Sequence, residues 1–127
     1  MEKRKPIRSF EDLFVWQFAI ELVKEVYLIT GKGALKTDFA LKDQFRRAAI
    51  SIPTNVAEGF ERRSRKEYLL FLNIAKGSAG ELRSLLRVAL EIGYLREADY
   101  EPLRAKTSRV SAYLANQMRA LSTVRNE

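Results

Sequence analysis

Apolar and small side chains recur at intervals of three and four residues along a central stretch of the sequence. The row continues for seven intervals and consists of Tyr68, Phe71, Ala75, Ser78, Leu82, Leu85, Ala89 and Ile92. Residues spaced in this way lie on one face of an α-helix, so the pattern predicts a helix with one buried side. Because such a stripe needs other helices to cover it, we expect an all-α fold.

Capping signals bound this helix. Ser64 and Glu67 match a capping box, which places the first helical residue at about Arg65, and Gly93 suits the position after the last one. Four small residues, 77–80, lie at its middle. Since each glycine costs about 1 kcal/mol of helix propensity against alanine, we expect another helix to cross closely there.

The first helix of the chain is expected to follow the capping box of Ser9 and Asp12 and to end near Thr30, before Gly31. It carries two adjacent apolar rows, which make a buried face wider than one neighbouring helix needs. This helix is therefore either central in the fold or shared with another subunit. The rows are Leu13, Trp16, Ile20, Val23, Tyr27 and Thr30, and Val15, Ala19, Leu22, Val26 and Ile29.

A second helix is expected from about residue 38 to residue 59, with Pro53 inside it. Proline removes a backbone hydrogen bond and crowds the carbonyl of Ala49, so we expect one kinked helix rather than two separate helices. The apolar face of this helix consists of Leu41, Phe45, Ala48, Ile52 and Val56.

The last helix is expected from Glu97 or Asp99 to Thr123, with Pro102 in its first turn. Four helices with short connections favour an antiparallel, up-down-up-down four-helix bundle. We expect it to form a single domain over residues 10–127, preceded by a basic N-terminal arm at residues 1–9.

The chain has no cysteine and no histidine, which excludes zinc fingers, iron–sulfur sites, thiol catalysis and His-dependent mechanisms. We therefore expect no enzymatic activity, no cofactor and no metal. No stretch approaches the ~18 apolar residues of a membrane span, and the first residues lack the apolar run of a signal peptide. A cytoplasmic protein that does not enter the membrane is the simplest expectation.

The net charge is +7, from 23 basic and 16 acidic residues. Such a charge favours nucleic acid, an acidic protein or an anionic membrane surface without choosing among them. For two of the candidate cations, Arg46 and Arg47, ion pairing or solvation is the favoured interpretation, whereas the cations of residues 62–66 are expected to bind an anion. The candidate residues for nucleic-acid binding are Arg46, Arg47, Arg62, Arg63, Arg65 and Lys66.

A polar set near the predicted kink could in principle be a metal site, but ferritin-like sites need histidines that this chain lacks. We expect these residues to cap helices, to satisfy the backbone freed by Pro53 or to form an Arg–Glu network that fixes subunit register. The set consists of Ser51, Asn55, Glu58, Glu67, Ser78 and Glu81.

The run Gln-Phe-Arg-Arg-Ala-Ala-Ile-Ser-Ile-Pro-Thr-Asn-Val-Ala-Glu-Gly at residues 44–59 resembles the bacterial four-helix-bundle proteins named for intervening sequences in 23S ribosomal RNA genes. The resemblance covers about residues 10–122 and implies a ring-like homopentamer. It also includes Phe10, Glu11, Asp12, Leu13, Val15, Trp16 and Gln17, and Arg62, Arg63, Ser64, Glu67, Phe71, Leu72, Ala75, Gly77, Ser78 and Glu81. Residues 31–36 depart from the family pattern, a Phe-Pro stretch, so we expect that loop to differ.

The resemblance leaves three hypotheses about function. The first is a non-enzymatic homo-oligomeric scaffold that binds RNA or DNA through phosphate contacts. The second is a protein-interaction adaptor, for example to a reverse transcriptase, because related accessory proteins of diversity-generating retroelements are basic pentamers thought to bind one. The third is a structural protein of an intervening element, with no strong ligand.

Overall fold

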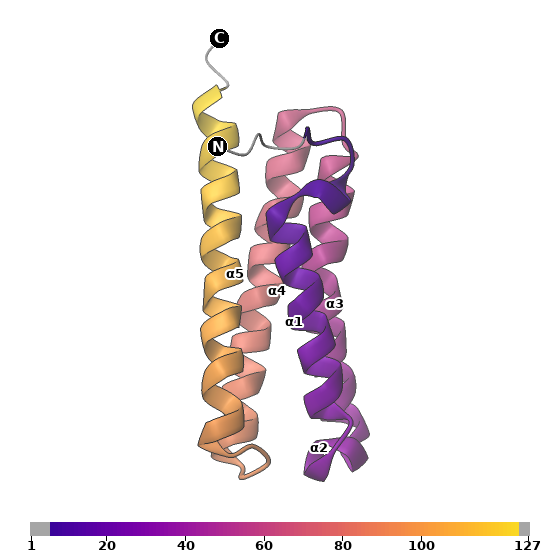
Figure 1. Cartoon of the computed structure of the whole chain (residues 1–127), viewed down its shortest axis with the longest axis vertical. Helices are drawn as coiled ribbons and strands as arrows, with labels where there is room; N and C mark the ends of the chain where they lie inside the picture. Colours follow the sequence, from indigo (N-terminus) through magenta and orange to yellow (C-terminus); the bar gives the residue numbers. More distant parts are fainter. Residues whose placement is uncertain (1–5, 125–127) are drawn as a thin grey trace.

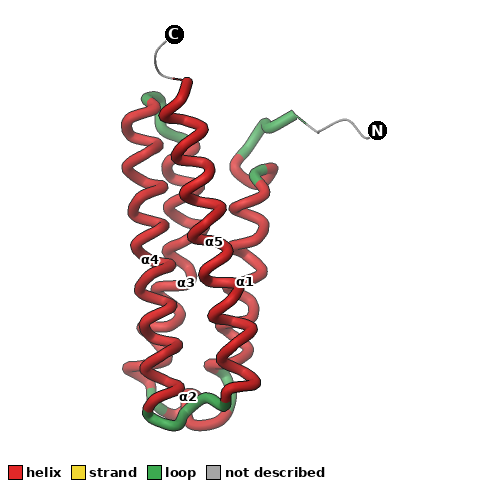
Figure 2. Tube along the Cα trace, turned by 90° about the vertical axis from the view of Figure 1, so that its left-hand side faces the viewer, coloured by secondary structure: helices red, strands yellow, loops and turns green. Residues whose placement is uncertain are grey.

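The computed structural model describes residues 6–124, in which all regular structure is helical (Figure 1). Four long helices pack antiparallel in up-down-up-down order: α1 (Phe14–Thr30), α3 (Phe39–Phe60), α4 (Arg65–Glu91) and α5 (Glu97–Val124). A 3₁₀ turn, η1 (Phe10–Asp12), precedes α1, and a short helix, α2 (Gly33–Thr37), connects α1 to α3. The connections lie at the two ends of the bundle (Figure 2). The predicted four-helix bundle is confirmed.

The first long helix begins later than the capping signal suggested. Asp12 accepts hydrogen bonds through Oδ2 from the backbone N–H groups of Arg8, at 2.9 Å, and Ser9, at 3.2 Å. These bonds stabilise η1 rather than an α-helix, because Leu13 has an extended backbone and α1 starts only at Phe14. Residues 1–5 of the predicted basic arm lie outside the described residues.

The segment expected to be a loop at residues 31–36 contains α2. Gly33 has φ +61°, a conformation that favours glycine, and it begins a helix of five residues. The burial of Leu35, which is 1% exposed, explains why this segment is helical. The expectation of a loop is wrong for residues 33–37.

Pro53 lies inside one uninterrupted helix, α3, as predicted. The side chain of Asp38 caps this helix by accepting a hydrogen bond from the Leu41 N–H at 3.1 Å. The kink at Pro53 stays a prediction.

The core lies along the bundle axis, where every long helix contributes buried apolar side chains. In α4 the buried stripe includes Leu72, Ala79 and Leu86, which the predicted row left out, whereas Ile92 is 52% exposed. In α1 the row from Val15 to Ile29 is buried. The other row of α1, which includes Trp16, Ile20 and Val23, is only half-buried, so the wide apolar face of α1 is not fully covered.

The close helix crossing expected at residues 77–80 is not formed within the chain. A Cβ atom placed on Gly77 or Gly80 would meet no atom within 4 Å. The close approach lies instead at Gly59 of α3, where an added Cβ would stand 2.9 Å from Phe71 Cβ and 2.9 Å from Tyr68 Cδ1. The sequence signal was misleading because both glycines of α4 lie away from the core.

Around the bundle, α1 packs on α3, α3 on α4 and α4 on α5, while the contact between α5 and α1 is smaller. That last contact includes an edge-to-face pair of Phe18 and Tyr113, with ring centroids 5.1 Å apart, and an ion pair of Lys106 with Glu25 at 2.6 Å. Within residues 6–124, no helix combines the length and the apolar character needed to cross a membrane.

Candidate nucleic-acid interface

The turn between α3 and α4 brings four of the six candidate cations together at one end of the bundle. The Ser64 hydroxyl caps α4 by accepting the N–H of Glu67 at 3.1 Å, and this fixes where the first turn of α4 begins. The side chains carried by the turn are exposed, and they are Arg62, Arg63, Arg65 and Lys66.

Arg62 differs from its neighbours because it is held against the protein. Its guanidinium forms an ion pair with Glu58 at 2.5 Å and lies over the ring of Phe71, 4.7 Å from the ring centroid. Arg63, Arg65 and Lys66 form no ion pair with any other residue that the structure describes. These three cations are therefore the ones that remain available to an anion.

Arg46 and Arg47 lie elsewhere on α3 and do not join this cluster. Arg46 donates a hydrogen bond to the Thr30 hydroxyl at 2.9 Å and stacks over the Tyr27 ring, 4.2 Å from its centroid. Arg47 forms an exposed ion pair with Asp43 at 2.9 Å. At 1.5 Å per helical residue, Arg46 lies about 24 Å from Arg62. The favoured interpretation of Arg46 and Arg47, ion pairing or solvation, fits this arrangement.

A row of cations on α4, which the sequence reading missed, continues from the turn along the side next to α5. Arg87 lies on this side of α4. Its guanidinium interacts with Tyr100 of α5, and that hydrogen bond is the main cause that raises the pKa of Arg87. Arg83 and Lys76 precede Arg87 by four and eleven residues, and Arg65 precedes Lys76 by eleven, so all lie on the same side of the helix. The spacings of seven and eleven were the signal that could have revealed this row.

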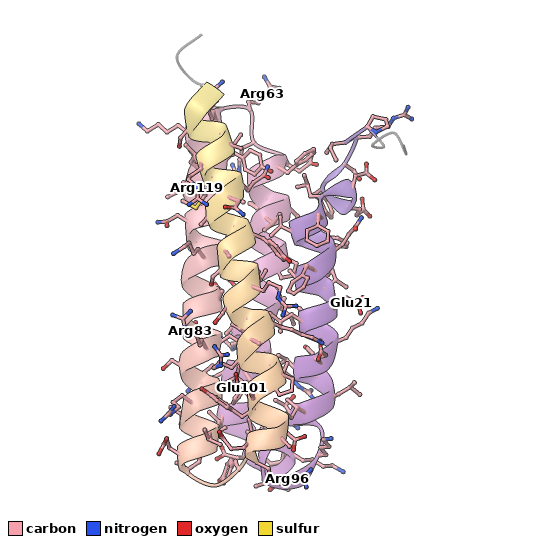
Figure 3. The ribbon with its side chains drawn as sticks, turned by 60° about the vertical axis from the view of Figure 1, so that its left-hand side comes forward. Glu21, Arg63, Arg83, Arg96, Glu101 and Arg119 are labelled. Carbon is pink, nitrogen blue, oxygen red and sulfur yellow. The ribbon has the colours of Figure 1, made fainter. Side chains whose placement is uncertain are left out.

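Arg119 of α5 extends the row. Figure 3 shows Arg83 and Arg119 on the same side of the bundle and Arg63 at its end. Arg119 is exposed and donates a hydrogen bond to the side-chain oxygen of Asn116. We call the following set the basic face: Arg63, Arg65, Lys76, Arg83 and Arg119. None of these five cations forms an ion pair with another described residue.

The opposite end of the α4–α5 side is neutralised by ion pairs. Arg87 pairs with Glu91 at 2.8 Å, and Arg104 pairs with Glu101 at 2.5 Å. The hydrogen bond from Arg104 is the main cause that lowers the pKa of the Glu101 carboxyl. The uncompensated positive charge is thus concentrated toward the α3–α4 turn.

The predicted polar set does not form one network. Ser51, Asn55 and Ser78 are connected, because the two hydroxyls lie 2.7 Å apart and the Asn55 amide donates to the Ser51 carbonyl at 2.8 Å. Glu58 pairs with Arg62, and Glu67 accepts a hydrogen bond from the Ser64 hydroxyl at 3.2 Å. Glu81 is exposed and joins none of these bonds in the described part of the chain. The set therefore divides into a link between α3 and α4, an ion pair and a helix cap.

The basic face suits contact with phosphates. Guanidinium groups bind phosphate oxygens through paired hydrogen bonds, and such contacts position a nucleic acid without reading its bases. From Arg65 to Arg83 the row is about 27 Å long, which matches roughly eight base-pair steps of B-form DNA. Among residues 6–124 no group of three or more carboxylates could hold a metal ion.

Comparison with known proteins places this geometry in context. The family described as 23S rRNA-intervening sequence protein matches residues 11–116. A solved structure from Bacteroides thetaiotaomicron, described as a protein of unknown function from the S23 ribosomal protein family, is 21% identical and has a TM-score of 0.75. The similarity covers 82% of this chain and 97% of that one, and it supports the fold. No curated protein matches the chain.

Proposed function

The chain belongs to the 23S rRNA-intervening sequence protein family, and we propose that it is a non-enzymatic, homo-oligomeric scaffold that binds nucleic acid through phosphate contacts. The family resemblance implies a homopentamer, and the proposal includes that ring. The observation that carries the nucleic-acid part is the basic face, a row of exposed cations with no ion-pair partner among the described residues.

Among the described residues, no ion pair neutralises the charge of the basic face. Arg46, by contrast, stabilises the fold at the end of α1, and Arg104 is neutralised by Glu101. Like charges in one row repel each other, and an anionic partner removes that repulsion. Five phosphate contacts would give a log–log salt slope of about −4.5 on duplex DNA, which is a loss of affinity on the order of 500-fold between 50 and 200 mM salt.

Fluorescence anisotropy with a labelled RNA hairpin and a labelled DNA duplex, titrated at several salt concentrations, tests this proposal. The variant Arg65→Gln/Lys76→Gln/Arg83→Gln should bind more weakly at low salt and should lose roughly 0.9 of slope for each phosphate contact removed. The control is Lys32→Gln/Lys36→Gln, which removes two exposed lysines at the α2 end of the bundle that, like the basic face, form no ion pair among the described residues. Its slope should equal that of the wild type.

The proposal fails if the wild type binds neither nucleic acid at 50 mM salt. It also fails if the control lowers the slope as much as the triple variant does. Circular dichroism spectra of the variants establish that any lost binding is not lost folding.

A further inference from the structure

An apolar groove runs along the outside of the bundle between α1 and α3. It encloses a volume of ≈ 540 Å³. Its walls are formed by the half-buried row of α1 and by the outer side of α3. The apolar residues that line it include Trp16, Ile20, Val23, Ile50, Pro53 and Ala57. Two carboxylates, Glu58 and Glu61, line its end near the α3–α4 turn. This groove is the part of the wide α1 face that residues 6–124 leave uncovered.

A complementary ridge lies on the outer side of α4. Leu70, Ile74 and Val88 are 56%, 42% and 43% exposed, and their spacing places them on one face of the helix. Gly77 lies in the same row, with open space where its Cβ would be. Gly77 lowers helix propensity by about 1 kcal/mol relative to alanine, and no described residue packs against it closely enough to require a glycine.

The upper part of the ridge, from Leu70 to Gly77, matches the groove in height along the bundle, whereas Val88 lies about 15 Å below the level of Ser78 and therefore below the groove. The contact between the Ser51 and Ser78 hydroxyls places these two residues at the same level of α3 and α4. Ile74 then lies about 6 Å above that level, and Thr54, beside the groove, about 4.5 Å above it. A neighbouring copy related by rotation about an axis parallel to the helices therefore presents the apolar ridge at the level of the apolar groove.

The charges match in the same register. Toward the α3–α4 turn, Lys66 lies about 18 Å and Glu61 about 15 Å from the level of Ser51 and Ser78. In the other direction, Glu81 lies about 4.5 Å and Arg47 about 6 Å from that level. Lys66 of one copy would thus meet Glu61 of the next, and Glu81 would meet Arg47, which also pairs with Asp43 of its own chain. The Lys66–Glu61 match, at the end near the α3–α4 turn, favours this pairing of surfaces and this direction.

We propose that the α4 ridge of one copy packs into the α1–α3 groove of the next copy. The inference rests on the homo-oligomeric part of the proposed function and identifies its contact surfaces. Because two different surfaces meet, the contact is heterologous, and repetition by rotation closes a ring. The α4 cations of the basic face, Arg65, Lys76 and Arg83, lie on the α5 side of α4, away from the ridge, so the proposed contact leaves them exposed.

Two substitutions, Ile74→Arg on the ridge and Ile50→Arg in the groove, test the contact. Both side chains are partly exposed in the single chain, at 42% and 41%, so an arginine is compatible with folding. In the assembly each would place an unpaired charge in an apolar contact. Light scattering should show a monomer of 14.6 kDa for each variant, whereas the control Leu28→Arg, a 72% exposed site elsewhere on α1, keeps the wild-type mass.

Mixing the two variants gives the sharper result. Each mixture contains one intact ridge and one intact groove, so the two chains should form a heterodimer and nothing larger. If either variant keeps the wild-type mass, or if the mixture stays monomeric, the ridge-and-groove contact is refuted while self-association stands. A monomeric wild type at micromolar concentration refutes both, and the anisotropy titration still tests the basic face independently.

Discussion

Gly59 is the point at which α3 approaches α4 most closely, and replacing it with alanine should destabilise the bundle. The new Cβ would stand 2.9 Å from Phe71 Cβ, 2.9 Å from Tyr68 Cδ1 and 3.2 Å from the Tyr68 carbonyl oxygen. The Phe71 Cβ and the carbonyl oxygen are fixed to the backbone of α4, so the helix itself must move. Turning the Tyr68 ring cannot relieve the clash.

The magnitude follows from two opposing terms. Overpacking a close contact costs about 1–3 kcal/mol, and alanine in place of glycine gains about 1 kcal/mol of helix propensity. Because two of the contacted atoms are fixed to the backbone, the cost should lie in the upper part of that range, and we expect a net loss of about 1–2 kcal/mol. Each kcal/mol corresponds to roughly 3–5 °C of melting temperature for a chain of this size.

The matched control is Gly80→Ala. Gly80 lies in the interior of α4, and an added Cβ there meets nothing within 4 Å, so the same chemical change should raise stability by about 1 kcal/mol. Urea and thermal unfolding measure both variants at one fixed protomer concentration, since the proposed oligomerisation would couple to unfolding. The close contact at Gly59 is refuted if Gly59→Ala is as stable as the wild type, or if the two substitutions change stability in the same direction.

Two further predictions concern single side chains. Arg46→Ala should lower the free energy of unfolding in urea by about 1–2 kcal/mol, because it removes a hydrogen bond to Thr30 and a cation–π contact with Tyr27. Arg47→Ala should change it by less than about 0.5 kcal/mol, because the ion pair of Arg47 is exposed. Equal effects of the two substitutions would contradict these separate roles. The hydrogen bond of the Tyr94 hydroxyl to Asp38, at 3.1 Å, raises the pKa of Tyr94. The stabilisation from this hydrogen bond is therefore present below the ordinary tyrosine pKa and is lost as the pH rises through the raised pKa of Tyr94. Tyr94→Phe should be less stable than the wild type at pH 7 and as stable as the wild type at strongly alkaline pH. A stability difference that persists at alkaline pH would refute this.

The sequence predicts the helices well because their signals are local. The seven-interval row of α4, the cap at Ser64 and the position of Pro102 each depend on neighbours within one or two turns. The helical segment around Leu35 was missed because its stability comes from the burial of Leu35 where α2 packs on α1 and α3, which no pattern within residues 31–36 reveals. The start of α1 was misplaced for a related reason, since a capping box stabilises a 3₁₀ turn as readily as an α-helix.

The basic face could be predicted only in part. The cations next to the α3–α4 turn are adjacent in sequence and were identified, except that Arg62 is held by Glu58. Lys76 and Arg83 are single charges among apolar residues, and only their helical spacing relates them to Arg65. Arg119 joins them through the packing of α5 on α4, which no local pattern reveals.

The proposed ridge-and-groove contact would account for two departures from the expected packing of a single chain. The wide apolar face of α1 left a choice between a central helix and a helix shared with another subunit, and in the bundle one of its two apolar rows lines an open groove. The glycines of α4 indicated a close crossing that the chain does not make, and Gly77 lies in an exposed apolar row. In the proposed contact, α4 of one copy covers the apolar row of α1 in the next copy, and that copy in turn packs closely against Gly77 of α4. Ile74→Arg and Ile50→Arg should therefore disrupt the same assembly from opposite sides, and only their mixture should restore a contact.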